Sequence, residues 1–334
     1  MTLRLAALGT TALVAFLSLP AVAQAADVTI MVGGVEKQIY LPAMLTQQLG
    51  YFKDEGITVD LLSEPSGVDA TDEMLAGAVQ GVVGFYDHTV DLQGLGKFAE
   101  SIVQFSQAPG EVELVSTKHP EVKTFADFKG KNLGVTGLGS STNFLTQYLE
   151  VKNGLQLSDV TSVPVGAGDT FIAAMKQDQI QGGMTTEPTI SRMLETGEAS
   201  VLIDMRTLDG TKAALGGTYP AASLYMPTDW VNAHKDLVQK LANAFVKTMK
   251  FINTHTAAEI ADKMPADYYV GNKDQYVKAL DAGKQMFTPD GVMPQGGPET
   301  VLAVLSQFKE SVKGKTIDLS KTYTNEFVAV ANKM

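Results

Sequence analysis

Leu49-Gly-Tyr-Phe-Lys-Asp-Glu-Gly-Ile-Thr-Val-Asp60 is the stretch that decides how the chain begins to fold. A helix ends at Gly50, since glycine is the commonest residue just past a helix end. The two aromatic residues that follow form a short turn that packs, and Gly56 lets the backbone reverse. Residues 57–62 then have the apolar pattern of a buried strand. The stretch therefore predicts a helix, a tight turn and a strand in succession.

The same alternation extends in both directions from this stretch. Residues 28–32 form an apolar strand that Gly33-Gly34 ends, and a helix with Pro42 in its first turn follows. Further strands are expected at 81–85, 112–116, 132–136, 160–165, 182–185, 200–204 and 222–226, with helices starting near residues 69, 142, 169 and 188. Strands that alternate with helices predict α/β architecture with parallel, doubly wound sheets.

The length of the chain predicts two lobes rather than one. About 309 residues follow the expected signal peptide, which exceeds the usual size of a single core. No Pro/Ser-rich linker is present, so we expect crossing strands near residues 112–117 and 219–226 to join the lobes. Lobe 1 is expected to span 27–115 plus 220–334, and lobe 2 to span 116–219. Beyond Thr228 the pattern predicts a helical C-terminal tail, with helices at 228–255, 257–264, 273–287 and 299–313 and from 325 to the end.

Residues 1–25 have the layout of a secretory signal peptide. Arg4 precedes an apolar run from Leu5 to Leu19, Pro20 breaks the run, and Ala23-Gln-Ala25 supplies a small-x-small cleavage site. The run is shorter than the roughly 20 residues that a membrane-spanning helix needs. We therefore expect a periplasmic protein that is secreted, is not inserted in a membrane and is monomeric.

Charge and cysteine content exclude several classes of function. The formal net charge is −11, and removal of Arg4 with the signal peptide makes it −12, which argues against nucleic acid and anionic membrane surfaces as partners. The chain contains no cysteine. Disulfides, thiolate metal sites, cysteine nucleophiles and a lipoprotein anchor are thereby excluded.

Three stretches carry a resemblance to a known family. They are the Leu49–Asp60 stretch, Phe125-Ala-Asp-Phe-Lys-Gly-Lys-Asn-Leu-Gly134, and Gln179-Ile-Gln-Gly-Gly-Met-Thr-Thr-Glu-Pro188. The chain resembles the periplasmic binding proteins of nitrate, sulfonate, taurine and thiamine-pyrimidine-precursor uptake, over residues 28 to about 255. It departs from the family pattern at Gln80 and at Gly182, where an acidic residue is common.

The resemblance implies a fold and a role. The fold is the type II periplasmic binding protein, with two doubly wound βα lobes joined by crossover strands. The role is that of the solute-binding subunit of an ABC importer, which captures a small organic molecule (a sulfonate, a carboxylate or a pyrimidine-like compound) between its lobes. Its partners are then that ligand and the transmembrane subunits of an ABC permease. An enzyme on the same fold, related to thiamine-pyrimidine synthases, is the alternative.

Candidate ligand-binding residues follow the expected strand ends, because ligands of open parallel sheets bind beyond the carboxyl ends of the strands. Ser140 to Thr142 combine hydroxyl groups with a helix start that can attract a negative group. Glu187 offers an acceptor for a ligand amine, amide or ring N–H. The full set is Gln38, Tyr40, Tyr86, Asp87, His88, Ser140, Ser141, Thr142, Thr186, Glu187 and Tyr219.

No catalytic, metal or cofactor site is expected from these residues. Asp87 and His88 adjoin each other, but no motif pairs them with a nucleophile. One histidine with one aspartate is also too few ligands for a metal site. We therefore expect the cleft to bind a molecule that both donates and accepts hydrogen bonds, such as a taurine-like sulfonate or a substituted pyrimidine, rather than nitrate.

Overall fold

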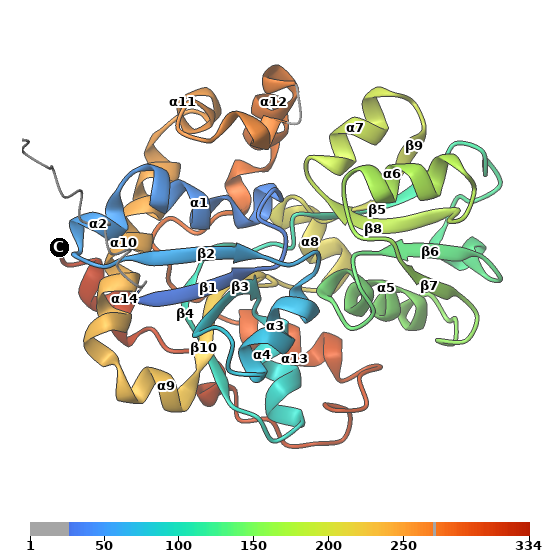
Figure 1. The fold of residues 1–334 in the computed structure, drawn as a ribbon. Helices are drawn as coiled ribbons and strands as arrows, with labels where there is room; N and C mark the ends of the chain where they lie inside the picture. Colours follow the sequence, from blue (N-terminus) through green and yellow to red (C-terminus); the bar gives the residue numbers. More distant parts are fainter. Residues whose placement is uncertain (1–26, 270–271) are drawn as a thin grey trace, which may run out of the picture.

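The computed structural model describes residues 27–269 and 272–334, so the expected signal peptide lies outside the described residues. The described chain contains two five-stranded sheets, ordered β2-β1-β3-β10-β4 and β7-β6-β8-β5-β9. Figure 1 shows the two sheets beside each other, with helices covering both faces of each. This is the two-lobed, doubly wound architecture that the alternation of strands and helices predicts.

The first lobe is built on strands from both ends of the chain. These are β1 (Val28–Val32), β2 (Val59–Ser63), β3 (Gly81–Phe85), β4 (Ala99–Gln104) and β10 (Ala222–Pro227). β1 pairs in parallel with β2 and β3, whereas β10 is antiparallel to its neighbours β3 and β4. The helices between them are α1 (Leu41–Gln48), α2 (Tyr51–Asp54), α3 (Gly67–Leu75) and α4 (Asp87–Gly94), with a 3₁₀ turn at Gln38–Tyr40.

The second lobe repeats this topology. Its strands are β5 (Glu111–Ser116), β6 (Asn132–Val135), β7 (Thr161–Pro164), β8 (Gly182–Thr186) and β9 (Ala199–Asp204). β5 is antiparallel to β8 and β9, while β6 is parallel to β7 and β8. Its helices are α5 (Ser141–Lys152), α6 (Asp169–Lys176), α7 (Thr189–Glu195) and α8 (Leu208–Leu215), with a 3₁₀ turn at Phe125–Phe128.

The chain crosses between the lobes at residues 105–110 and returns through residues 205–221. β5 belongs to the second sheet. The first lobe therefore ends before Glu111, where this strand begins, and not at residue 115 as expected. The expected strands at 112–117 and 219–226 therefore do not cross between the lobes. They pair inside the sheets, and the segments that precede them make the crossings.

The C-terminal helices pack around the first lobe, as the orange and red ribbon in Figure 1 shows. The helix expected at 228–255 is divided at His234 into two, and the helix expected at 299–313 stops at Leu305. The amphipathic α10 buries Phe245 against Phe52 and Phe105, with ring centroids 5.3 and 4.9 Å apart. The helices are α9 (Thr228–Ala233), α10 (Lys235–Thr254), α11 (Ala257–Ala261), α12 (Lys273–Gly283), α13 (Gly297–Leu305) and α14 (Glu326–Ala331), with 3₁₀ turns at Ala266–Tyr269, Lys284–Met286 and Leu319–Lys321.

Contacts between the lobes bring them close together. The Gln38 backbone N–H donates to the Glu187 carbonyl at 3.1 Å, and the Gln275 side chain donates to Glu195 on α7 at 2.7 Å. The Lys309 ammonium lies 4.2 Å from the centre of the Phe144 ring on α5. These contacts come from three separate places along the interface, so the lobes face each other across a narrow cleft.

Candidate ligand-binding cleft

A small cavity lies between the lobes and is lined by residues of both. Its volume is about 10 Å³, which is room for about one water molecule. A ligand of several heavy atoms therefore needs the lobes to move apart from this arrangement. The lining residues are Lys37, Tyr40, Gly67 and Phe85 from the first lobe, and Glu111, Thr136, Ser140, Ser141, Thr142 and Thr186 from the second.

Strand ends place these residues at the cavity. Phe85 and Thr186 are the last residues of β3 and β8, and Thr136 directly follows β6. Each of these strands ends with its carboxyl terminus at the cleft, as expected for parallel sheets. Glu111 reaches the same place differently. It is the first residue of β5, which runs antiparallel to β8, and its register partner is Thr186.

The hydroxyl groups before α5 hydrogen-bond to one another. Ser140 Oγ donates to the Gly137 carbonyl at 2.7 Å, and Thr136 Oγ1 lies 3.0 Å from Ser140 Oγ and 2.9 Å from Thr142 Oγ1. Ser140 Oγ and Thr142 Oγ1 are 2.7 Å apart. The hydroxyl groups of Thr136, Ser140 and Thr142 can thus all donate to acceptors within this group. The donors left for a ligand are the backbone N–H groups in the first turn of α5, rather than the hydroxyls expected from the sequence.

Asp87 joins the two lobes at the edge of the cavity. Its Oδ1 accepts a hydrogen bond from Ser141 Oγ at 2.8 Å, and its Oδ2 accepts one from the Tyr219 hydroxyl at 3.0 Å. Asp87 is fully buried, and this burial raises the pKa of its carboxyl above the usual range. The carboxyl group of Asp87 therefore lies beside the first residue of α5, at the positive end of that helix.

Lys37 is a cavity-lining cation whose hydrogen bonds go to the backbone. Its Nζ donates to the carbonyls of Gly33 at 2.6 Å and Pro65 at 2.8 Å. Burial lowers the pKa of Lys37 to about 8, against the opposing attraction of nearby acids that include Glu111. The two carbonyls hold the ammonium group in place, and one of its three hydrogens remains for another acceptor.

Three buried polar atoms around the cavity lack a hydrogen-bond partner among the described residues. They are Glu111 Oε2, Thr186 Oγ1 and His88 Nε2. The His88 ring reaches the wall at Gly67, where an added Cβ would lie 3.0 Å from Nε2. Burial raises the pKa of Glu111 well above its usual range, and nearby Asp87 raises it further. Unpaired buried polar atoms are costly, so atoms gathered at one cavity point to a ligand.

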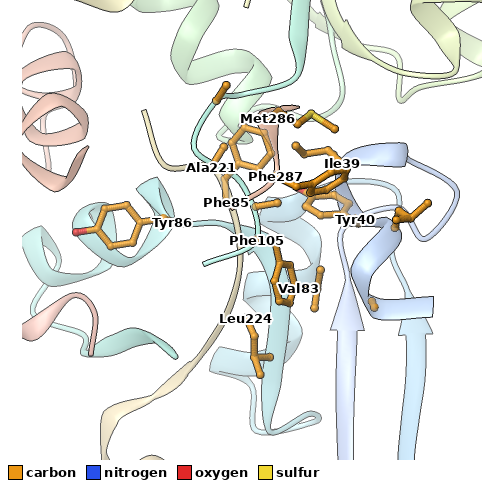
Figure 2. Close-up of a cluster of buried hydrophobic side chains, with 14 of the residues drawn as sticks. Ile39, Tyr40, Val83, Phe85, Tyr86, Phe105, Ala221, Leu224, Met286 and Phe287 are labelled. Atoms are coloured by element: carbon orange, nitrogen blue, oxygen red, sulfur yellow. The ribbon is translucent and has the colours of Figure 1, made fainter. Parts of the chain in front are cut away.

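An apolar cluster beside the crossing segments supports the cavity. Figure 2 shows Ile39, Tyr40, Met286 and Phe287 gathered near Phe85, and the Tyr40 and Phe85 rings meet edge to face with centroids 6.1 Å apart. Tyr86 points away from this cluster and hydrogen-bonds to Thr322 at 2.5 Å. Tyr86 is thus part of the first-lobe core, whereas the sequence places it in the site.

The residues expected to bind a ligand fall into three groups. Tyr40, Ser140, Ser141, Thr142 and Thr186 line the cavity. Asp87, His88 and Tyr219 stand directly behind it, through the contacts with Ser141 and Gly67 described above. Tyr86, Gln38 and Glu187 are outside the lining.

Glu187 and Gln38 hold the structure together instead of facing the cavity. Glu187 Oε2 accepts the Ser191 backbone N–H at 3.0 Å, and its Oε1 accepts from Ser191 Oγ and Arg206, also at 3.0 Å each. The Gln38 side chain donates to the Tyr276 carbonyl at 2.9 Å. Protein donors reach both oxygens of Glu187 in this arrangement of the lobes, and its expected role as ligand acceptor stays a prediction.

Sequence reasoning missed five residues of the lining, which are Lys37, Gly67, Phe85, Glu111 and Thr136. Lys37 adjoins the predicted Gln38, and Thr136 ends the strand expected before the predicted Ser140 to Thr142, so both lie close in sequence to predicted site residues. Glu111 carries a weaker signal, which is an acidic residue at the start of an otherwise buried strand. That signal points to the cleft only once the strand is known to run antiparallel to β8.

Within residues 27–269 and 272–334, no group of three or more His, Cys, Asp or Glu side chains is placed to hold a metal ion. None of the helices described there has both the length and the apolar character to cross a membrane.

Several solved structures share the fold of this chain. A structure from Bordetella bronchiseptica RB50 is 36% identical, with a TM-score of 0.88, covering 92% of this chain and 96% of that one. The alkanesulfonate-binding protein SsuA from Xanthomonas axonopodis pv. citri, bound to MOPS, is 17% identical with a TM-score of 0.71, covering 90% and 99%. The desulfurization enzyme DszB is 14% identical with a TM-score of 0.62, covering 92% and 99%.

Sequence comparison gives the family. No curated protein sequence matches the chain significantly. Residues 39–258, about two thirds of the chain, match the family described as NMT1/THI5 like. This match and the relative from Bordetella bronchiseptica agree with the type II periplasmic binding protein fold described above. The chain belongs to the NMT1/THI5-like family.

Proposed function

We propose that this protein is the periplasmic solute-binding subunit of an ABC importer. It captures a small organic molecule in the cleft between its lobes and delivers it to the transmembrane permease. The observation that carries this proposal is the cavity at the lobe interface, where Glu111, Thr186 and His88 bring buried polar atoms that have no partner in the described part of the chain. Such atoms gain hydrogen bonds when a ligand enters, and that gain favours binding.

The arrangement of the lobes supports capture by domain movement. Two crossing segments, 105–110 and 205–221, connect the sheets, so the lobes can rotate about them. The cavity has room for about one water, so the ligand enters an opened cleft and both lobes then contact it. Capture between two lobes allows a permease to distinguish the loaded protein from the empty one by its shape.

The surroundings of His88 favour binding over catalysis. A general base needs a hydrogen bond to a nucleophile. His88 Nε2 has no partner among the described residues, and the nearby Ser141 hydroxyl donates to Asp87. The alternative is an enzyme on this fold, related to thiamine-pyrimidine synthases. It is kept because DszB, a named enzyme, shares the fold.

A thermal-shift screen of the purified protein against several hundred small metabolites tests the proposal. A ligand at 100 times its Kd adds about 2.7 kcal/mol to the free energy of unfolding, so a true ligand raises the Tm measurably. Mass spectrometry of each hit after prolonged incubation should recover the compound unchanged. No hit in the full screen, or a hit that the protein converts to a product, would contradict the proposal.

A further inference from the structure

We propose that the ligand is a small compound that presents a nitrogen-bound hydrogen to Glu111, as an amine, an amidine or an aminopyrimidine does, and that the cleft discriminates against anions. The inference rests on the proposed function, because it concerns the ligand of the same cavity. It narrows the ligand classes that the fold and the sequence leave open.

Glu111 is the acceptor that faces the cavity. It is 2% exposed, and its Oε2 has no hydrogen-bond partner among the described residues. Thr186 is its register partner on β8, so the two side chains lie on the same face of the sheet, and both line the cavity. A bound cation favours the ionised form of Glu111, which can accept from two N–H bonds in parallel, and the Thr186 hydroxyl group lies beside it.

Positive charge that could hold an anion is scarce at the cavity. Among the described lining residues, Lys37 is the only lysine or arginine. Its ammonium group already donates to the Gly33 and Pro65 carbonyls. Arg206 is outside the lining, and its guanidinium group is bound to Asp204 and Glu187. Of the positively charged side chains in the described lining, an anion would thus meet at most one free N–H of Lys37.

The helix terminus that could bind an anion already faces a carboxyl group of the protein. Ser141, the first residue of α5, hydrogen-bonds to Asp87. A ligand anion at this helix start would lie next to Asp87 and within the same small cavity as Glu111. Whenever either carboxyl group is ionised, it repels such an anion strongly, because water screens charges poorly in a buried site. A cationic or neutral N–H donor is attracted by the same two groups.

The experiment uses matched pairs of probe compounds on the full mature protein. The pairs are acetamidine with acetate, ethylamine with ethanesulfonate, and 4-aminopyrimidine with pyrimidine, together with the hits of the metabolite screen. Isothermal titration calorimetry gives the Kd of each for wild type, Glu111→Gln and Glu113→Gln. Glu113 is the matched control, because it lies on the same strand, is fully buried and has no hydrogen-bond partner within residues 27–269 and 272–334, but does not line the cavity.

We expect the N–H donor of at least one pair to bind at least tenfold more tightly than its partner. Glu111→Gln should weaken that compound roughly 10- to 100-fold, which is the scale for a hydrogen bond to a charged group. Glu113→Gln should leave its Kd within about twofold, since it makes no cavity contact. Circular dichroism and the Tm of each variant confirm that the fold is retained.

Two other results separate this inference from the proposed function. If the protein binds anions or compounds without N–H groups preferentially, or if Glu111→Gln binds the N–H donors as wild type does, the inference is overturned and the solute-binding role stands. If neither the pairs nor the screen yields any ligand, the proposed function fails and the inference fails with it.

Discussion

Ser141 Oγ, at the start of the second lobe's α5, lies 2.8 Å from Asp87 Oδ1 of the first lobe and donates a hydrogen bond to it. The bond joins the lobes at the wall of the cavity. Asp87 is fully buried, so a lost donor leaves its carboxyl group poorly compensated. This single contact therefore links the stability of the protein to the approach of its lobes.

Replacing Ser141 by Ala should destabilise the protein by about 1–3 kcal/mol, since it removes one of the two donors to Asp87. Urea unfolding of wild type and variant measures the change. Ser162→Ala is the control, because Ser162 Oγ accepts its hydrogen bond from Asn143 within the second lobe. The variant should also show a larger radius of gyration by small-angle scattering. An unchanged radius and an unchanged free energy of unfolding would mean that the bond contributes nothing.

Glu187→Ala should reduce stability rather than ligand affinity. The substitution removes the acceptor of Ser191 and one partner of Arg206, and we expect a loss of about 1–3 kcal/mol in the free energy of unfolding. Ligand affinity should stay within a few-fold of wild type, because Glu187 is outside the cavity lining. Titration calorimetry with the best screen hit checks this, and an affinity loss as large as that of Glu111→Gln would place Glu187 in the site after all.

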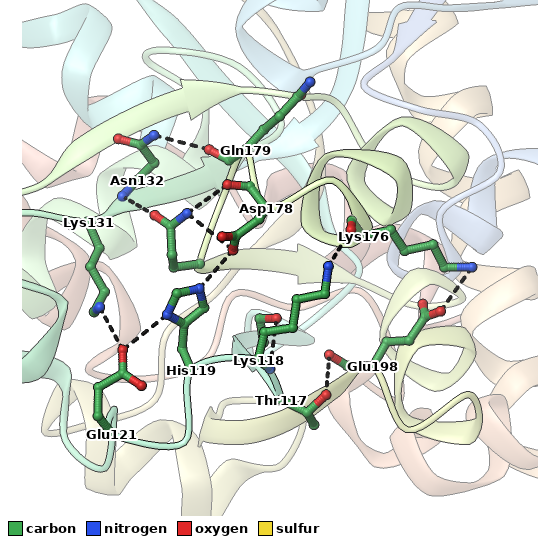
Figure 3. Close-up of polar contacts among 12 residues, drawn as sticks. Thr117, Lys118, His119, Glu121, Lys131, Asn132, Lys176, Asp178, Gln179 and Glu198 are labelled. Atoms are coloured by element: carbon green, nitrogen blue, oxygen red, sulfur yellow. Dashed lines mark hydrogen bonds and ion pairs between the residues drawn. The ribbon is translucent and has the colours of Figure 1, made fainter.

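His119 makes the stability of the second lobe depend on pH. Figure 3 shows its ring between two carboxylates, with Nε2 2.7 Å from Asp178 and Nδ1 3.0 Å from Glu121. The hydrogen bond to Asp178, followed by that to Glu121, raises the pKa of His119 in the folded state. Its contribution is therefore fully present below the unfolded pKa, about 6.5, and is lost as pH rises through the higher folded pKa.

We expect the difference in free energy of unfolding between wild type and His119→Gln to be larger at pH 5.5 than at pH 9. Denaturant unfolding at several pH values measures it. His234→Gln serves as the control, since that histidine contacts the backbone carbonyl of Trp230 and no carboxylate. A difference that stays constant over this range would show that His119 does not change its protonation between the folded and unfolded states.

Binding of a cationic ligand should release protons. Burial and the neighbouring carboxyl of Asp87 raise the pKa of Glu111, Lys37 opposes this, and Glu113 adds to it. A positive charge beside Glu111 lowers its pKa again, so part of the Glu111 population gives up a proton on binding. Calorimetry in two buffers of different ionisation enthalpy should give different observed heats. Equal heats in both buffers would indicate that Glu111 stays in one protonation state.

The fold could be predicted further than the site. The alternation of hydrophobic strands with helices is visible in the sequence and predicts a doubly wound sheet. The expected strand ends then predict that the loops at Tyr40, Ser140 and Thr186 lie at the site. Glu111 could not be placed this way, because its position depends on the antiparallel pairing of β5 with β8. The contacts of Glu187 could not be predicted for a similar reason. Its partner Arg206 arrives from a loop 19 residues later, which no local pattern indicates.

Helix boundaries show the same limit. The apolar periodicity from Thr228 to His255 is continuous, yet the structure interrupts the helix at His234. The His234 ring stacks on Trp230 with centroids 4.4 Å apart, and its Nδ1 lies 2.9 Å from the Trp230 carbonyl. A side chain that hydrogen-bonds to a backbone carbonyl competes with the helical N–H for that acceptor. Whether the side chain makes this bond depends on the packing around it, which the sequence does not reveal locally.

Hydrogen–deuterium exchange with and without the best ligand of the screen tests the central claim most directly. If the ligand is held between the lobes, exchange should slow in peptides of both lobes that line the cavity, namely 65–71 in the first and 136–146 and 182–187 in the second. Peptides around His119, at the far end of the second lobe, should be unaffected. Protection confined to one lobe, or located away from the cavity, would contradict capture in the cleft.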